Sequence, residues 1–479
     1  MSSNSIHSST RRSFSAALVS AFLGLIQVVA LAHLVPKNEL ALAALSGVWV
    51  GLAAHLQEGG VNAAIVQRPQ NPLAILSTLY WFNLLQGVLL WGCVALTGWG
   101  MALFFGESKL VALSAVYAIT LLAGGFSAQY KALLQKNFRF RSLSKIEITG
   151  AAMGFATSLL LAWQSWGAWA LVTGYLMRQL TESCLIIVTG FSLFHPKAIW
   201  QPKSAAPWFK LGFSHLGERL TTHFVSQLDT LLIGKFWGAE ALGAYDTFRR
   251  VIFRPAVLIG SAAEQVSFPL FSKLQSRPLL LRKAYLNMLN GLNTLLFPAY
   301  VLAIVLAEPL VKLIFDVSWL QYTDVFQWIC LSAMIAVQLN PVDSLLMAKG
   351  KIQLWLQASL LLGGLTVLAL TATSGQGLGF AAGALAFAQA LLCCLVFFKI
   401  LPGQLNVTVS DLRKSVAMPF LFCLLAALPL LLLYRQNWSF WNIGGALLFA
   451  GLYLAANKRW NNAVFNWLLN LLSGMSTRN

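Results

Sequence analysis

The chain has 479 residues, of which 58% are hydrophobic and only 10% are charged, and its mean hydropathy is +0.70. This composition is typical of an integral membrane protein and excludes an ordinary soluble domain. A net charge of +18 would suggest a nucleic-acid partner in a soluble protein. Here the placement of the basic residues between apolar segments explains most of it.

Fourteen apolar segments are long enough to be membrane-spanning helices, because about 20 apolar residues are needed to cross the hydrocarbon layer. The third continues apolar to Phe105 and the ninth to about Phe315, so both helices are expected to be longer or tilted. The first follows only two positive charges and no convincing cleavage site precedes Pro36, which predicts a retained helix rather than a cleaved signal peptide. The predicted spans are residues 15–34, 41–65, 73–97, 110–130, 146–164, 168–194, 213–234, 243–271, 286–306, 324–347, 353–373, 377–398, 415–434 and 440–457.

The basic residues fall almost entirely in alternate loops. The N-terminus, the even-numbered loops and the C-terminus hold 23 of the 33 Lys and Arg residues, and the opposite loops hold only five. The positive-inside rule therefore predicts that both termini are cytoplasmic. The longest hydrophilic stretches, residues 131–145 and 195–212, are too short for a soluble domain. Residues 458–479 carry apolar side chains at helical spacing and are predicted to form a cytoplasmic amphipathic tail that lies on the membrane or packs on the bundle.

Two segments of the chain repeat at a spacing of about 200 residues. Residues 34–40 and 236–242 open the second and eighth spans, and residues 145–147 and 351–353 open the fifth and eleventh. The sequence therefore predicts an all-α polytopic protein with about 14 transmembrane helices, in two six-helix lobes of the same orientation plus two C-terminal helices. The lobes are residues 1–194 and 195–398, followed by spans 13 and 14 in residues 399–457.

Signatures of enzymes and of metal sites are not found. The chain has no Walker-type loop, no GxSxG elbow and no zincin motif. Its six cysteines lie in apolar segments without CxxC spacing and are predicted to be small core residues. The six histidines are scattered, so neither a metal nor another cofactor is expected.

Function is expected at the arginines that lie inside spans, since a cation in hydrocarbon is expensive and normally faces a protein interior or a watery cavity. At about 100° per residue, Asp246, Arg250, Arg254 and Glu264 fall in one sector of the eighth span, and Pro255 should kink that helix. A surplus of guanidinium groups suits a phosphorylated ligand, because the planar fork matches phosphate oxygens. The predicted cavity residues are Arg178, Arg219, Arg249, Arg250 and Arg254.

Simple ion pairing is the alternative interpretation of these residues. Arg178 and Glu182 stand four residues apart, as do Asp246 and Arg250, and side chains at that spacing meet on a helix. The carboxylates Glu218, Asp229 and Glu264 are candidates for coupling transport to protons or sodium, or are structural partners of the arginines.

The cations and phenylalanines that alternate in residues 131–145 have two interpretations. They either form an interfacial stop that contacts anionic lipids or a docking strip for a lipid-linked diphosphate.

Several strings of the sequence resemble the Wzx-type polysaccharide flippases of the multidrug/oligosaccharidyl-lipid/polysaccharide superfamily. These strings, whose order and spacing matter more than any one of them, are QEGGVNAAIVQRP at 57–69, YWFNLLQG at 80–87, LQKNFRF at 134–140, GAWALV at 167–172, DTLLIG at 229–234, ALGAY at 241–245, FPLFSKLQ at 268–275 and RKAY at 282–285. The resemblance covers roughly residues 10–400. The second span departs from the pattern, since it carries His55 and Glu58 but no arginine.

This resemblance implies an inner-membrane flippase that moves an undecaprenyl-diphosphate-linked oligosaccharide repeat, of an exopolysaccharide, an O-antigen or a similar glycan, to the periplasmic leaflet by alternating access. The expected partners are that lipid-linked oligosaccharide and membrane lipids, with other polysaccharide-assembly proteins left open and no nucleic acid. Two alternatives remain at this point. A cation or drug antiporter of the same superfamily would need an anionic cavity, and a membrane glycan polymerase or ligase would need larger periplasmic loops.

Overall fold

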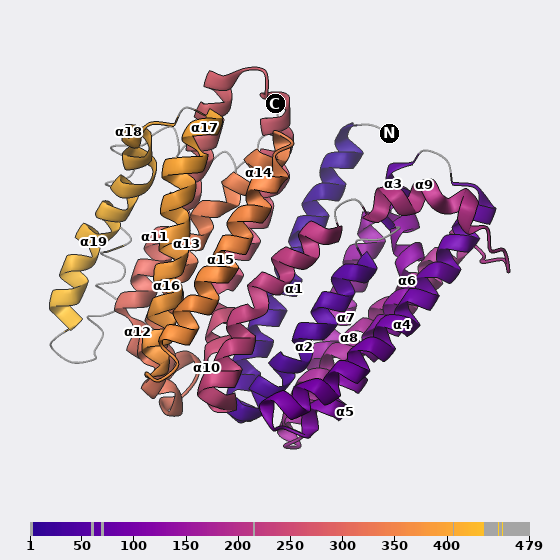
Figure 1. The fold of residues 1–479 in the computed structure, drawn as a ribbon, viewed down its shortest axis with the longest axis horizontal. Coiled ribbons are helices and arrows are strands. Elements are labelled where there is room, and N and C mark those ends of the chain that lie inside the picture. Colours follow the sequence, from indigo (N-terminus) through magenta and orange to yellow (C-terminus); the bar gives the residue numbers. More distant parts are fainter. Residues whose placement is uncertain are drawn as a thin grey trace. The chain divides into compact units, whose positions relative to one another are not determined.

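The computed structural model of the chain describes residues 3–58, 62–68, 71–213, 216–405, 407–434, 449 and 453. Among these residues the secondary structure is entirely helical. The first half comprises α1 Ser3–Leu34, α2 Lys37–Glu58, α3 Asn62–Gln67, α4 Leu73–Phe105, α5 Lys109–Tyr117, α6 Ile119–Lys136, α7 Phe140–Trp163, α8 Ala168–Gly190, η1 Phe191–Leu193, α9 Pro202–Phe213 and α10 Leu216–Lys273 (Figure 1). The second half comprises α11 Pro278–Val305, α12 Ala307–Ile314, η2 Val317–Tyr322, α13 Thr323–Ala336, η3 Val337–Leu339, α14 Asn340–Ala348, α15 Ile352–Ala372, α16 Leu378–Leu395, η4 Val396–Ile400, α17 Pro402–Leu405, α18 Val409–Leu412, η5 Arg413–Ala417 and α19 Met418–Tyr434.

The prediction of a multi-pass, all-α membrane protein is confirmed. Within the described part of the chain, nine helical runs are long and apolar enough to cross a membrane, among them the full length of α4 to Phe105. Helices α1, α10 and α19 occupy four further predicted spans, and residues 440–457 and 458–479 lie almost wholly outside the described residues. The number fourteen and the amphipathic tail therefore stay predictions.

Several predicted spans are interrupted. The ninth does not continue unbroken to Phe315, because α11 ends at Val305 and a separate helix, α12, starts at Ala307. Pro309 explains the restart, since it has no N–H to donate to the Val305 carbonyl.

The seventh and eighth spans form one element, α10, whose two arms meet at Gly238 with φ 83° and ψ 177°. Only glycine adopts this backbone readily, and the helix remains helical through Pro255.

One helix lies in a segment that the sequence predicts to be a loop. Helix α9 packs on α3 and α4, and Figure 1 shows α3 and α9 together at one end of the first unit. The Trp208 indole donates to the side-chain oxygen Oδ1 of Asn71 at 3.0 Å, and the Arg68 guanidinium lies 4.1 Å from the ring centroid of Trp208. Helix α9 has only 12 residues and contains prolines, so its sequence does not show the pattern of a membrane span.

Internal contacts group the chain into two compact units, Met1–Thr247 and Phe248–Asn479. The core of the first unit contains Leu79, Tyr130 and Ile65, all nearly inaccessible. In the second unit Phe248 packs against Phe315 and Phe326, with ring centroids 5.0 and 5.3 Å apart. The expectation that the cysteines are core residues is confirmed for Cys330, Cys393 and Cys423 and wrong for Cys93, Cys184 and Cys394, which are exposed on their helices.

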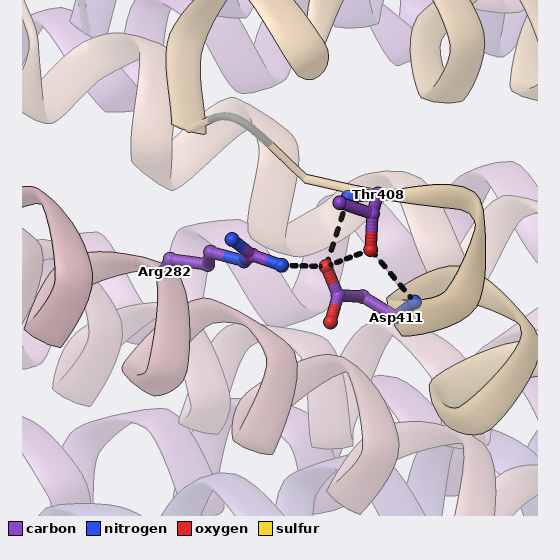
Figure 2. Close-up of polar contacts among 3 residues, drawn as sticks. All are labelled: Arg282, Thr408 and Asp411. Atoms are coloured by element: carbon purple, nitrogen blue, oxygen red, sulfur yellow. Dashed lines mark hydrogen bonds and ion pairs between the residues drawn. The ribbon is translucent and has the colours of Figure 1, made fainter.

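In the second unit, Arg282, Thr408 and Asp411 form a polar cluster at the start of the C-terminal helices, which we call the latch (Figure 2). The Asp411 carboxylate accepts from the Thr408 backbone N–H at 2.8 Å and from the Thr408 hydroxyl at 2.7 Å, and it forms an ion pair with Arg282. The reciprocal contact, from the Asp411 N–H to the Thr408 hydroxyl, makes this a capping box in front of α18 and α19. The latch therefore ties the start of α11 to the segment that leads into α19.

Candidate functional site

A polar cavity of about 520 Å³ lies inside the first unit. It is bounded by α2, α3, α5, α6, α8 and the first arm of α10. Its size is in the range of pockets that hold a small organic ligand, about 300–1,000 Å³. All of its lining residues belong to the one compact unit Met1–Thr247.

Contacts between α2 and α10 fix the level at which each lining residue lies. Leu45 lies beside Gly234, and Gly51 lies beside His223, whose ring is also 4.6 Å from that of His55. Residue numbers thus rise along α2 as they fall along α10, so the two helices run antiparallel. Arg219, one turn before His223, therefore lies near the C-terminal end of α2.

Contacts of α8 with α5 and α6 fix the levels of the lining residues on the other side of the cavity. Tyr117 and Tyr175 meet edge to face with ring centroids 5.0 Å apart. Ten residues after Tyr117 and eight after Tyr175, the hydroxyl groups of Ser127 and Ser183 are 3.0 Å apart. Helices α6 and α8 therefore run side by side in the same direction, and Gln179 lies between these two levels.

The end of the cavity beside Gly47 of α2 is lined by aromatic, uncharged side chains. Tyr117 lies against Gly47, where an added Cβ would be 3.4 Å from its ring. Tyr175 completes this end from α8. Tyrosine offers a flat apolar face together with a hydroxyl group, a combination suited to ligands that are apolar on one side and polar on the other.

The middle of the cavity is lined by neutral hydrogen-bonding groups. Gln57 is buried, and its amide nitrogen donates to the Leu121 carbonyl at 2.8 Å. Its side-chain oxygen lies against Gly124, which leaves room for the amide because it has no side chain. Gln179 and Thr120 line the same level.

The far end of the cavity carries its cations. Lys131 lies ten residues beyond Leu121 on α6, which is about 15 Å along the helix. Asn62 and Gln135 line this end as well, and Arg219 reaches it from α10. No Asp or Glu occurs among the described residues that line the cavity, and their charged members are Lys131 and Arg219.

Among the predicted cavity residues, the structure places Arg219 in the cavity lining and Arg178 elsewhere. The Arg178 side chain forms an ion pair with Glu182 at 2.8 Å, as the pairing interpretation expects. Glu182 is 15% exposed and packs against the Gly150 position of α7. The ion pair thus lies within α8, on the face that packs against α7.

The other predicted residues are distributed over both arms of α10. Asp229 accepts a hydrogen bond from the Tyr245 hydroxyl at 2.9 Å, which joins the two arms across the bend at Gly238. Arg250 and Glu264 are exposed, and Arg249 and Arg254 are partly buried. The Glu218 side chain lies outside the described part of the structure, and the roles of all these residues in binding or ion coupling stay predictions.

Sequence reasoning assigned Lys131 to a basic loop and did not single out Gln179, whereas it names Gln57 among the polar residues that the second span adds to a cavity. The structure shows that residues 131–145 are mostly helical, with α6 reaching Lys136 and α7 starting at Phe140. Lys131 is therefore a helical residue one turn inside the end of α6. The signal that could have found it is its spacing from Ser127 and Gly124, which puts all three residues on one face of α6.

The fold and the cavity define a class, a polytopic membrane transporter with a cationic cavity. Among solved structures, the inward closed conformation of the lipid II flippase MurJ is similar over 94% of this chain and 99% of that chain, with a TM-score of 0.77 and 15% sequence identity. An inward-facing multidrug resistance transporter of the MATE family in the MOP superfamily is similar over 81% and 96%, with a TM-score of 0.60 and 14% identity. At these identities the likeness establishes the fold.

The sequence relatives narrow the class to a family. The family described as "Polysaccharide biosynthesis protein" matches residues 30–324, and the chain belongs to this family. TuaB of Bacillus subtilis, a teichuronic acid biosynthesis protein, is 30% identical over 66% of each chain. WzxC of Escherichia coli, a lipopolysaccharide biosynthesis protein, is 26% identical over 69% of this chain and 68% of its own. A membrane protein of the cps region of Klebsiella pneumoniae is 26% identical over 94% and 95%. The resemblance to this family is thus confirmed, as is the prediction of a transporter rather than an enzyme.

Proposed function

We propose that this protein is a flippase for an undecaprenyl-diphosphate-linked oligosaccharide repeat unit of an exopolysaccharide, an O-antigen or a similar glycan. It moves the repeat unit from the cytoplasmic to the periplasmic leaflet of the bacterial inner membrane by alternating access of its two lobes. Both termini are cytoplasmic in this proposal, in accord with the distribution of basic residues.

The charge of the cavity in the first unit is the observation that carries this proposal. Lys131 and Arg219 are its charged lining residues, and the described lining has no carboxylate. A diphosphate needs cationic, hydrogen-bond-donating partners, which lysine and arginine supply. The relatives are named for the biosynthesis of teichuronic acid and lipopolysaccharide, which supports a glycan substrate.

The same observation disfavours an antiporter of organic cations. Such a transporter needs a negative or neutral site, and two cations among the described lining residues would repel its substrate. The arginines of the second arm of α10, Arg249, Arg250 and Arg254, add to the positive charge along the chain. We assign them to the second half of the substrate path, with Glu218, Asp229 and Glu264 as candidates for ion coupling.

The test is the double variant K131A/R219A in cells where it replaces the native protein. Loss of two charge-assisted contacts should reduce surface-polysaccharide export at least tenfold and cause lipid-linked repeat units to accumulate on the cytoplasmic side. The matched control is K203A, which removes an exposed cation of α9 that does not line the cavity. Unchanged export by K131A/R219A at equal protein level would refute the role of this cavity.

A further inference from the structure

The charged and uncharged residues of the cavity lie at different levels, and this separation bears on the ligand. Lys131 lies on the side of Gln57 that faces α3, and Arg219 lies near the C-terminal end of α2. From Gln57 to Tyr117 the lining is neutral, and it consists of amides, hydroxyl groups, tyrosine rings and small apolar residues. The cavity therefore has a cationic end and a longer neutral part.

The neutral part has the chemistry of a sugar site. A pyranose presents hydroxyl groups around its edge and C–H groups on its faces. Carboxamides can donate to and accept from hydroxyl groups at the same time, and tyrosine rings can cover an apolar face. Gln57 and Gln179 supply the amides at one level, and the pair Tyr117 and Tyr175 closes the end.

Among the described residues, no charged side chain lines this neutral part of the cavity. Arg178 is next to Gln179 in sequence, but its guanidinium is held by Glu182 at 2.8 Å and is not part of the lining. Lys109 is likewise held by Glu39, at 2.5 Å, near the start of α2. A carboxylate placed between Gln57 and Tyr117 would thus be desolvated without a cation to compensate it, which is unfavourable.

We propose that the part of the cavity between Gln57 and Tyr117 binds the sugar attached directly to the diphosphate, and that it accepts an uncharged sugar and rejects a uronic acid. This inference rests on the proposed function, since the diphosphate is placed at Lys131 and Arg219. Lys131 lies about 15 Å along α6 from Leu121, the residue that Gln57 contacts. A diphosphate at the cationic end therefore directs its first sugar toward the amides. Gln179 is the residue through which the protein distinguishes the two sugars.

Three probes that differ in one feature test this proposal on the purified full-length protein in lipid nanodiscs. They are undecaprenyl diphosphate alone, the same lipid with one glucose and the same lipid with one glucuronic acid. The wild-type protein should bind the glucose probe at least tenfold more tightly than the glucuronic acid probe, and more tightly than the bare lipid. Q179L should weaken binding of the glucose probe by roughly three- to tenfold and leave the bare lipid unaffected, because it removes hydrogen bonds to the sugar alone.

A charge-introducing variant makes the test sharper. Q179K adds a cation beside the sugar, so it should reverse the preference in favour of glucuronic acid. Q164L, a change at an exposed glutamine that follows α7, is the control and should bind all probes as the wild type does.

The outcomes separate the two proposals. Equal binding of the glucose and glucuronic acid probes, or equal effects of Q179L on the bare and sugar-bearing lipids, would overturn the sugar site while leaving the flippase proposal intact. Failure of the wild type to bind any of the three lipids would overturn both. Loss of all binding in K131A/R219A, together with selective loss of the glucose probe in Q179L, is the result that supports both.

Discussion

Gly124 and Gly125 are neighbours on α6, yet the structure predicts that alanine substitutions at these two positions fail in different ways. A Cβ at Gly125 would lie 2.8 Å from the backbone carbonyl oxygen of Asn83 on α4. A Cβ at Gly124 would instead overlap the side-chain oxygen of Gln57, the amide that lines the cavity. The first clash is with a rigid backbone and the second with the end of a movable side chain.

The magnitudes follow from these contacts. In G125A, α4 and α6 must separate by about 0.6 Å to reach the 3.4 Å of ordinary contact. Such overpacking costs about 1–3 kcal/mol, against a gain of about 1 kcal/mol from the higher helix propensity of alanine. In G124A the Gln57 amide swings away and loses its bond to Leu121, which costs about 0.5–1.5 kcal/mol and is offset by the same gain.

G125A should therefore lower the free energy of unfolding by up to about 2 kcal/mol, whereas G124A should be within about 1 kcal/mol of the wild type but export little polysaccharide. Thermal unfolding in detergent measures the first quantity, and glycan export at equal protein level measures the second. G92A on α4 is the control, since nothing lies within 4 Å of an added Cβ there.

A thermodynamic cycle decides whether Gln57 mediates the effect of G124A. If it does, Q57A and G124A/Q57A should export equally, because the second change removes a group that is already displaced. Additive losses in the double variant, or a G125A protein as stable as G92A, would contradict the reasoning.

Three further predictions concern ion pairs and arginines. R178A should destabilise the protein by about 1–3 kcal/mol by leaving Glu182 without its partner, and R178A/E182A should recover part of the loss in thermal unfolding; equal losses would contradict the pair. Partial burial alone would raise the pKa of Asp411, but hydrogen bonds from Thr408 and Arg282 lower this pKa below the usual value of about 3.9. The stability that the latch contributes is therefore present above that pH and is lost as the pH falls further. The thermal stability of D411N should be lower than that of the wild type at pH 7, and the difference should shrink toward pH 3; a difference that grows on acidification would refute this sign. R250A/R254A should reduce glycan export about tenfold or more at equal protein level, and unchanged export would remove these arginines from the substrate path.

The sequence predicts the class and most helices of this fold because membrane spans are specified by composition. A helix such as α4 needs only a long apolar run, and its 33 residues were expected to extend to Phe105. The breaks are harder to predict, since the bend at Gly238 depends on a backbone conformation and the helix α9 on its packing against Arg68 and Asn71. Neither leaves a periodic signal in the sequence.

The site is predicted less well than the fold, and charge explains the difference. An arginine inside an apolar segment is conspicuous, so the sequence draws attention to Arg178 and Arg219 equally. The spacing of Arg178 and Glu182 allows an ion pair as one interpretation, and the structure decides for it, since Arg178 pairs with Glu182 on its own helix while Arg219 lines the cavity. A neutral amide such as that of Gln179 attracts no attention in a sequence, although it is costly to bury without partners.

The distribution of charge within the cavity suggests how a transporter can hold this substrate without trapping it. A diphosphate enclosed by many cations would bind tightly in every conformation, which would slow its release on the other side. With Lys131 and Arg219 at one end and neutral groups beyond, most contacts with a bound sugar would be single hydrogen bonds, each contributing about 0.5–1.5 kcal/mol. Selectivity then comes from rejecting buried charge rather than from strong attraction, and the ligand can still leave. Adding a cation in this neutral part, as Q179K does, should therefore change which sugar is accepted and slow release as well.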